Sequence, residues 1–311
     1  ASAFLLTHLV TLTHYPVADC DEAHYSNVAS VFLERGVFGN NLTGEDRPIA
    51  QNSTGVGRLF ALGVAFFFRW LGVSLFSARL FSLAGYLATI VLLYFAGRSV
   101  FHPTTGLLAA ALFALSWIAL LHGHSGRPDV WTSAGGIFAF LMLQLAISKE
   151  RIVWAGAAGL VAALTIEFHL NGIHFLAASG ALALVWGLRR RAWAWLFAYG
   201  SGVTCGLFIW FFGHYLMSPV PTALVQEIAT ATIQHSMAGK LTGLVDWWWR
   251  QYWVGTNYES LLQGLYFGLG PGVLAIRREF KGRMLVAYII LSALSFGLVA
   301  LVQEDWYRVL W

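Results

Sequence analysis

Apolar residues dominate this chain in long runs that are separated by short polar segments. Runs long enough to cross a bilayer as a helix, which takes about 20 residues, lie at 77–97, 130–148, 193–213 and 284–302. The run "GLLAAALFALSWIALL" at 106–121 shows no period-two alternation of the kind that membrane β-barrel strands require. The pattern therefore predicts an all-α, polytopic helical membrane protein. Counting the shorter apolar runs, we expect eight or nine spans in a single transmembrane domain, 1–311.

Composition agrees with this class. The chain is 58% hydrophobic and 11% charged, whereas soluble domains average about 45–50% apolar and about 25% charged residues. Its net charge of +4 reports membrane topology rather than a nucleic-acid partner, and we expect none. The two cysteines, Cys20 and Cys205, predict no disulfide framework. We expect the chain to be part of a longer protein that continues beyond both of its ends.

The basic residues predict the topology. Four basic clusters, at 98–102, 149–151, 189–191 and 277–283, belong on the cytoplasmic side by the positive-inside rule. Spans must alternate between them, which places the remaining polar segments on the other side of the membrane. The predicted external segments are the first loop at 17–76 with its interface helices, a loop at 122–130, a Trp-rich segment at 214–260 and the end at 303–308.

Two segments need a special interpretation. The stretch 154–188 has cytoplasmic charge at both ends, so it must be a hairpin of two short spans with its turn near 167–174. The apolar run 56–72 has only about the minimum length for a span. We interpret it as a helix in the outer leaflet, with a full short span as the alternative.

The stretch "DCDEAHY" at 19–25 combines three carboxylates with the start of a helix. Asp19 and Glu22 have the spacing of a helix N-cap and its reciprocal partner, a capping box. Asp21 is not needed for that cap and lies in the first turn, where the helix dipole stabilises an anion. Because an apolar face follows, from Tyr25 to Phe32, the sequence predicts an external helix of about four turns.

At this point the residues resemble a family, the GT-C membrane glycosyltransferases, and most closely the protein O-mannosyltransferases and the ArnT-like aminoarabinose transferases. The resemblance rests on four motifs in order, over about residues 15–145. They are "DEAHY" (21–25), "EDRPIA" (45–50), "SARLFS" (77–82) and "GRPD" (126–129).

The resemblance implies an inverting transfer of a sugar from a polyprenyl-phosphate carrier to an unknown acceptor, on the extracytoplasmic side of the membrane. Asp21 and Glu22 match the catalytic pair, with Asp21 as the general base. Arg47 matches the residue that binds the lipid phosphate, and Arg127 or Arg308 would supply a second cation. The expected lining of the site comprises Asp46, His124, Asp129, Glu167, His169 and Asn171.

Several alternatives stay open. Asp46, Glu22 and Asp129 would suit a divalent metal, but the sequence does not decide whether one is bound. The polar side chains of the hairpin turn could instead only form hydrogen bonds to the backbone of the turn. His122 and His124 could likewise only form hydrogen bonds at the membrane interface. A catalytically silent subunit of a larger membrane complex and a membrane transporter are the other function classes. The expected location is the plasma or inner membrane of a prokaryote.

Overall fold

The computed structural model describes residues 2–42, 57–217 and 280–302, and these form helices and loops without a strand. Asp46, Arg47, Arg308 and the segment 218–260 lie outside the described residues. The helices are α1 (Ser2–Thr11), α2 (Cys20–Arg35), α3 (Arg58–Leu71), α4 (Leu75–Val100), α5 (Pro103–Ala114), α6 (Trp117–His124), α7 (Asp129–Lys149), α8 (Ile152–Leu164), η1 (Thr165–Glu167), η2 (Leu170–Gly172), α9 (Ile173–Arg190), α10 (Trp193–Met217) and α14 (Phe280–Val302). The predicted all-α class is confirmed.

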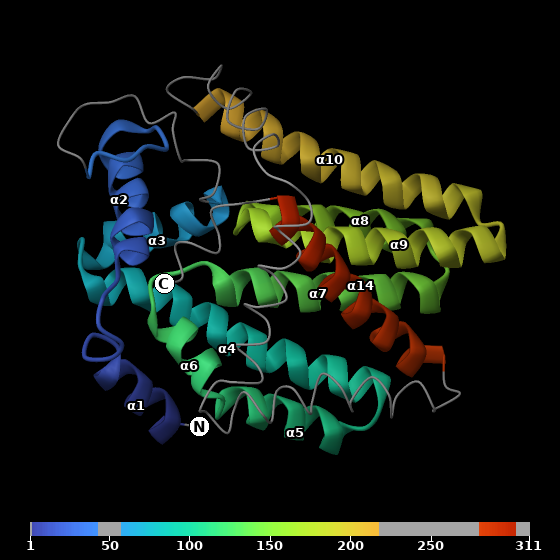
Figure 1. Ribbon diagram of the computed structural model, residues 1–311, viewed down its shortest axis with the longest axis horizontal. Helices are drawn as coiled ribbons and strands as arrows, with labels where there is room; N and C mark the ends of the chain where they lie inside the picture. Colours follow the sequence, from blue (N-terminus) through green and yellow to red (C-terminus); the bar gives the residue numbers. More distant parts are fainter. Residues whose placement is uncertain (1, 43–56, 218–279, 303–311) are drawn as a thin grey trace.

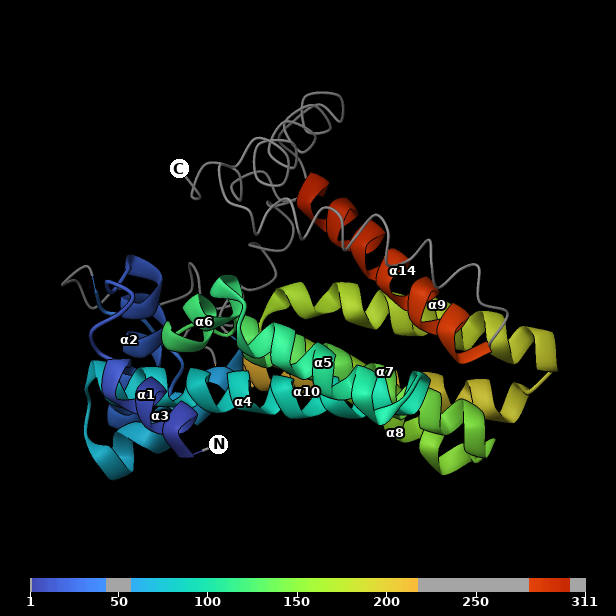
Figure 2. The ribbon, with the colours of Figure 1, turned by 90° about the horizontal axis from the view of Figure 1, so that it is seen from below.

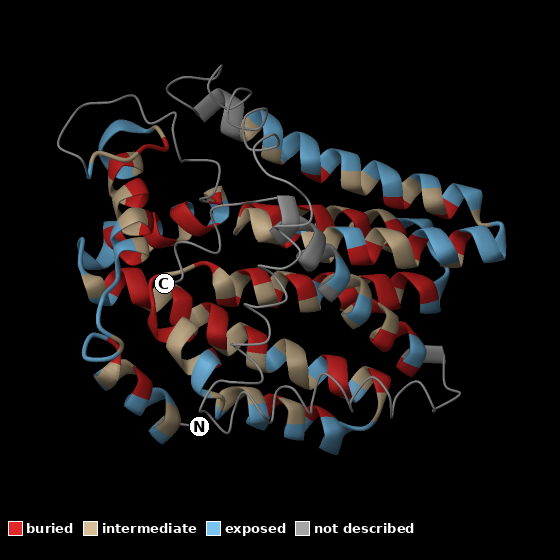
Figure 3. Ribbon diagram, viewed as in Figure 1, coloured by how far each residue is buried: buried red, intermediate tan, exposed pale blue. Residues whose placement is uncertain are grey.

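The long apolar helices form a layered bundle. Among the described residues, four helical segments are long and apolar enough to cross a membrane, namely Leu75–Val100, Asp129–Lys149, Leu170–Arg190 and Trp193–Gly213. They run side by side along the long axis of the molecule, and α14 crosses them obliquely (Figures 1 and 2). Burial is densest in α4, α7 and α8, whereas the outer side of α10 is mostly exposed (Figure 3). An exposed apolar face is expected of a helix that meets lipid.

The apolar stretch 105–122 is not one straight helix but two helices that meet at a bend. α5 and α6 are bent by 64° at a break between Ala114 and Trp117, where Ser116 has an extended backbone. Tyr86 of α4 donates a hydrogen bond to the carbonyl oxygen of Ala114 at 2.6 Å, which satisfies an acceptor that the break would otherwise leave without a partner. The bend turns the end of α6 toward α2 (Figure 1).

The predicted hairpin path of 154–188 is confirmed, while its crossing of the membrane as two short spans stays a prediction. α8 and α9 run in opposite directions and the turn between them contains η1 and η2. The Thr165 hydroxyl lies 2.9 Å from the carbonyl oxygen of Gly172 and 2.7 Å from that of Ala162, so one side chain closes the turn. The turn comes back to the end of the bundle that carries α2 and α3 (Figure 1).

Helix α3 is apolar on two sides. Phe60, Val64 and Phe68 are buried against the rest of the protein, while Phe66 and Trp70 are exposed. Its 14 residues are fewer than a membrane span requires, as expected for a helix in the interface. Its position in the outer leaflet stays a prediction.

A buried ion pair joins α2 to α4. Arg79 donates two parallel hydrogen bonds to Glu22, Nε to Oε1 at 2.8 Å and Nη2 to Oε2 at 2.7 Å, and a third from Nη1 to the carbonyl oxygen of Leu12 at 2.8 Å. Glu22 also accepts from the backbone N–H of Gly126. Both side chains are almost completely buried. The paired geometry and the extra hydrogen bonds compensate two charges for the loss of water.

Helices α8 and α10 approach each other through glycine. A Cβ at Gly202 of α10 would overlap with the carbonyl group of Gly156 in α8, and one at Gly159 with the carbonyl group of Tyr199. Small residues permit such close backbone contact between membrane helices. Gly200, only two residues from Gly202, has no heavy atom near its Cβ position.

Gly202→Ala should therefore destabilise the protein, by about 1–3 kcal/mol, because overpacking forces the helices apart. Gly200→Ala is the matched control on the same helix. It should be neutral or stabilising by up to about 1 kcal/mol, since alanine favours helix. Thermal unfolding of both purified variants in one detergent tests this. Equal stabilities of the two variants would contradict the close α8–α10 contact.

Arg79→Met should cost about 3–5 kcal/mol of stability, because it leaves the Glu22 carboxylate buried without its cation. Arg69→Met is the control, since Arg69 is exposed near the end of α3. Denaturant unfolding measures both effects. Combining Arg79→Met with Glu22→Gln should recover part of the loss, and a double variant as unstable as the sum of the singles would argue against the pair.

Candidate active site

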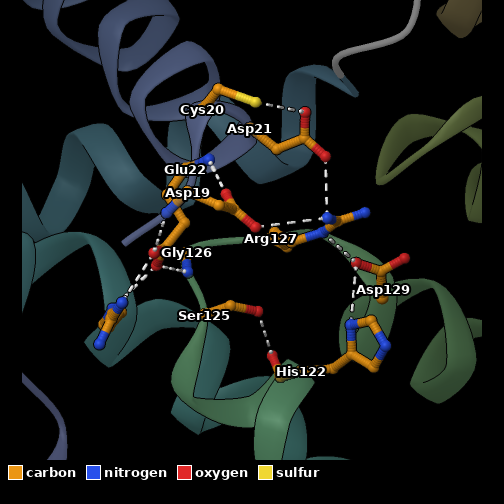
Figure 4. A network of polar contacts seen from close by, with 10 residues as sticks. Asp19, Cys20, Asp21, Glu22, His122, Ser125, Gly126, Arg127 and Asp129 are labelled. Carbon is orange, nitrogen blue, oxygen red and sulfur yellow. Dashed lines mark hydrogen bonds and ion pairs between the residues drawn. The ribbon is translucent and has the colours of Figure 1, made fainter. Parts of the chain in front are cut away.

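Four chain segments bring polar side chains together at one end of the bundle. They are the start of α2, the end of α6, the loop at 125–128 and the start of α7 (Figure 4). The predicted capping box is present, with the Glu22 N–H donating to Asp19 Oδ1 at 2.8 Å and the Glu22 side chain accepting from the Asp19 N–H. It fixes the first turn of α2, so Asp21 is presented toward the loop.

Arg127 lies at the centre of this cluster. Its Nη1 is 2.8 Å from Asp21 Oδ2 and 3.6 Å from Asp19 Oδ2, and its Nε is 3.0 Å from Asp129 Oδ2. One guanidinium therefore meets three carboxylates, which come from the first turns or caps of two helices. Figure 4 shows it between Asp21 and Asp19 on one side and Asp129 on the other. The structure thus brings together Asp21, Arg127 and Asp129, three of the residues expected at the site, and their roles stay predictions.

His122 extends the cluster to α6. Its Nδ1 is 3.4 Å from Asp129 Oδ2, so Asp129 contacts a histidine and an arginine at once. Asp129 is also the first residue of α7, where the helix dipole favours a carboxylate. The bend between α5 and α6 gives the end of α6 this position.

The hairpin turn adds His169 to the surroundings of the cluster. Burial lowers the pKa of His169, although the Asp129 carboxylate opposes this shift. The ring should therefore be neutral near pH 7. Its Nδ1 accepts from the backbone N–H of Asn171 at 3.1 Å, which leaves the proton of the neutral ring on Nε2. Asn171 thus enters the site through its backbone, by setting the tautomer of His169.

The charges of the cluster affect two further groups. Burial by itself would lower the pKa of Arg127, but Asp129 and Asp21 raise it more, so the net shift is upward. Burial and the Asp129 charge raise the pKa of Tyr25, which keeps its phenol neutral. Tyr25 packs in the core beneath the cluster. The cluster can therefore hold a fixed cation against several carboxylates, all of them partly exposed.

The other predicted site residues form pairs that do not involve Arg127. Glu22 is buried in its pair with Arg79 and does not face the cluster's exposed side. Glu167 pairs with Arg58, whose Nε is 3.1 Å from Glu167 Oε2. His124 is buried and its Nε2 lies 2.6 Å from His8 Nδ1. Within 2–42, 57–217 and 280–302, no three His, Cys, Asp or Glu side chains are placed to hold a metal ion.

Two arginines that pair with predicted site residues were not predicted as partners from the sequence. Arg79 pairs with Glu22, and Arg58 joins α3 to the hairpin turn and, through a 2.6 Å bond to the carbonyl oxygen of Ile209, to α10. A signal was available for Arg79, because a cation inside an apolar span is costly unless it is paired. Arg58 offered none, since it lies at the start of a short apolar run where a flanking cation is ordinary.

Comparison with known sequences finds two similarities. Residues 58–215 match the family model of dolichyl-phosphate-mannose-protein mannosyltransferase, which is just over half of the chain and begins after α2. A probable arabinosyltransferase A of Mycobacterium leprae (strain TN) is 32% identical over 87 residues, which cover 27% of this chain and 8% of that protein.

Comparison with solved structures gives the fold. ArnT from Cupriavidus metallidurans, both bound to undecaprenyl phosphate and in the apo state, matches with a TM-score of 0.54. The identity is 18% and 17%, and the match covers 96% of this chain but 58% of the ArnT chain. This chain thus spans well under two thirds of the length of these relatives. It belongs to the dolichyl-phosphate-mannose-protein mannosyltransferase family, and its all-α membrane domain has the GT-C fold of ArnT.

Proposed function

We propose that this chain is the membrane domain of an inverting glycosyltransferase that transfers a sugar from a polyprenyl-phosphate carrier to an acceptor on the extracytoplasmic side. The observation that carries the proposal is the half-exposed carboxylate of Asp21, held at the start of α2 by Arg127 at 2.8 Å. The family supports sugar transfer, and the relative of the same fold that was crystallised with undecaprenyl phosphate supports a lipid-phosphate donor.

In the proposed reaction Asp21 acts as the general base. It takes the proton of the acceptor's nucleophilic group as that group attacks the anomeric carbon from the face opposite the phosphate. The bond from the anomeric carbon to the phosphate oxygen breaks, and its electron pair stays on that oxygen. Single displacement of this kind inverts the anomeric configuration.

The departing phosphate needs nearby cations, because negative charge develops on its oxygen. Arg47 is the proposed phosphate ligand, with Arg308 as a second one, and Asp46 would line the same site. These three residues lie outside the described part of the chain, so their roles rest on the resemblance of their motifs. A divalent cation held by Asp46 and Asp129 is a further proposal, which chelation during turnover would test.

The proposed side of the membrane follows from the two ends of the bundle. The site cluster occupies one end, while Arg98, Lys149 and Arg190 end their helices at the other (Figure 1). Met284 of α14 lines the same cavity as Ser148 and Arg190, so α14 also begins at the basic end. Basic loops favour the cytoplasm, so we place the cluster on the extracytoplasmic face of a prokaryotic plasma or inner membrane.

Sidedness can be measured with two single cysteines in a variant that lacks Cys20 and Cys205. Val17→Cys lies in the exposed first loop and Ser148→Cys at the exposed end of α7. A membrane-impermeant maleimide added to intact cells should label Val17→Cys and spare Ser148→Cys until the membrane is opened. Labelling of both from outside would overturn the topology, and labelling of Ser148→Cys alone would invert it.

Asp21→Asn should lower turnover by about 10²–10⁴-fold, the usual loss for a general base, with little change in donor binding. Arg47→Ala should instead weaken donor binding, and slow the chemistry if charge builds on the leaving oxygen. Turnover and binding are measured separately with undecaprenyl- and dolichyl-phosphate-linked sugars.

Glu34→Gln is the matched control for these variants, because Glu34 is an exposed carboxylate at the far end of the same helix. If Asp21→Asn and Glu34→Gln both turn over at the parent rate, Asp21 is not the base. If no polyprenyl-phosphate sugar binds the parent protein, a silent subunit of a larger membrane complex becomes the better interpretation.

A further inference from the structure

We infer that Arg127 is a positioning residue for Asp21 and not a ligand of the donor phosphate, and that it leaves Asp21 Oδ1 as the oxygen that receives the acceptor's proton. This inference deepens the proposed function and rests on it. It replaces the expectation that Arg127 supplies a second cation to the lipid phosphate.

The backbone of Arg127 is anchored by two hydrogen bonds. Its N–H donates to the carbonyl oxygen of Ser125 at 2.8 Å, and its own carbonyl oxygen accepts from the Ser82 hydroxyl at 2.9 Å. Ser82 belongs to α4, the same helix that carries Arg79. The loop at 125–128 is thus attached to the buried core, and Arg127 has little freedom to move toward a ligand.

Two of the guanidinium nitrogens, Nε and Nη1, already contact carboxylates. Nε donates to Asp129 Oδ2 at 3.0 Å, and His122 Nδ1 lies 3.4 Å from the same oxygen. Nη1 faces Asp21 Oδ2 at 2.8 Å, with Asp19 at 3.6 Å. Because the guanidinium is a rigid plane with donors at fixed angles, holding Asp129 on one edge fixes where the other edge can hold Asp21.

The arrangement distinguishes the two oxygens of Asp21. Oδ2 is held by Arg127, whereas within residues 2–42, 57–217 and 280–302 Oδ1 has only the Cys20 thiol at 4.0 Å, a weak contact at the limit of hydrogen bonding. The Asp21 side chain is 37% exposed. Figure 4 shows Oδ1 on the side of Asp21 that faces away from Arg127. Oδ1 is therefore the oxygen that an acceptor can reach, and the proton taken from the acceptor goes to it.

A role as phosphate ligand fits the charges poorly. Three carboxylates lie around one guanidinium, so the group carries a net negative charge of about two before any donor arrives. A phosphate bound at Arg127 would lie beside these carboxylates, and their negative charges would repel it. A guanidinium that already contacts three carboxylates is better suited to hold one of them in place than to bind a further anion.

The test is a double-mutant cycle between Arg127→Gln and Asp21→Asn, with Arg69→Gln as the exposed control. Turnover and the dissociation constant of an undecaprenyl-phosphate-linked sugar are measured for each protein. Arg127→Gln should lower kcat about 10–100-fold, since a misplaced catalytic group costs up to about 10²-fold. Donor binding should stay within about twofold of the parent value.

The decisive readout is the cycle. If Arg127 acts through Asp21, Arg127→Gln should cost almost nothing further in the Asp21→Asn background. Arg127→Lys should recover part of kcat, because one ammonium keeps the charge but cannot hold both Asp129 and Asp21 in a fixed plane. If Arg127 had a merely structural role, its substitution would lower the yield of folded protein in every background. The loss of kcat would then not disappear in the Asp21→Asn background.

Three outcomes would overturn the inference while the proposed function stands. They are donor binding weakened tenfold or more by Arg127→Gln, a full additional loss of kcat in the Asp21→Asn background, and a parental kcat in Arg127→Gln when Asp21→Asn is inactive. If Arg127→Gln does not fold, Arg127→Lys takes its place and the same three criteria apply. A parental rate in Asp21→Asn, or a parent protein without transfer activity, would instead remove the proposed function and this inference with it.

Discussion

The buried pair of Glu22 and Arg79 is the interaction on which the geometry of the site depends. A carboxylate and a guanidinium inside an apolar bundle cost several kcal/mol each to desolvate, so neither would remain there without the other. Their two parallel hydrogen bonds constrain how α2 is placed relative to α4. The first turn of an otherwise peripheral helix is thereby fixed to a long apolar helix of the bundle.

The same carboxylate also positions the loop that faces Asp21. Glu22 accepts from the N–H of Gly126, and the next residue, Arg127, contacts Asp21. Two adjacent acids on α2, Glu22 and Asp21, therefore contact two adjacent residues of the loop, Gly126 and Arg127. Glu22 is buried and holds the two segments together, while Asp21 stays half-exposed. This difference explains why the sequence places two carboxylates side by side, and why only one of them suits chemistry.

Sequence patterns predicted the features that follow from local chemistry or from charge. The capping box of Asp19 and Glu22 is local, and the hairpin at 154–188 follows from basic residues at both of its ends. The break between α5 and α6 was not predictable in this way. The stretch that contains it is apolar on both sides of Ser116, and a single serine does not by itself indicate a break in an apolar helix. The carbonyl oxygen at the break is paired with the Tyr86 hydroxyl of another helix. The pairing of Arg58 with Glu167 likewise joins residues 109 positions apart, a distance over which periodicity carries no information.

Two helix starts face each other across Arg127, and this has a consequence for the cluster. The positive ends of the α2 and α7 dipoles would repel a cation placed between them. The carboxylates in their caps and first turns, Asp19 and Asp21 on α2 and Asp129 on α7, reverse the sign of both ends. Arg127 is then attracted from two sides, and its fixed charge links helices that begin 109 residues apart. The site is thus assembled by the same carboxylates that stabilise the helix starts, and one of them, Asp21, keeps an oxygen directed away from the network.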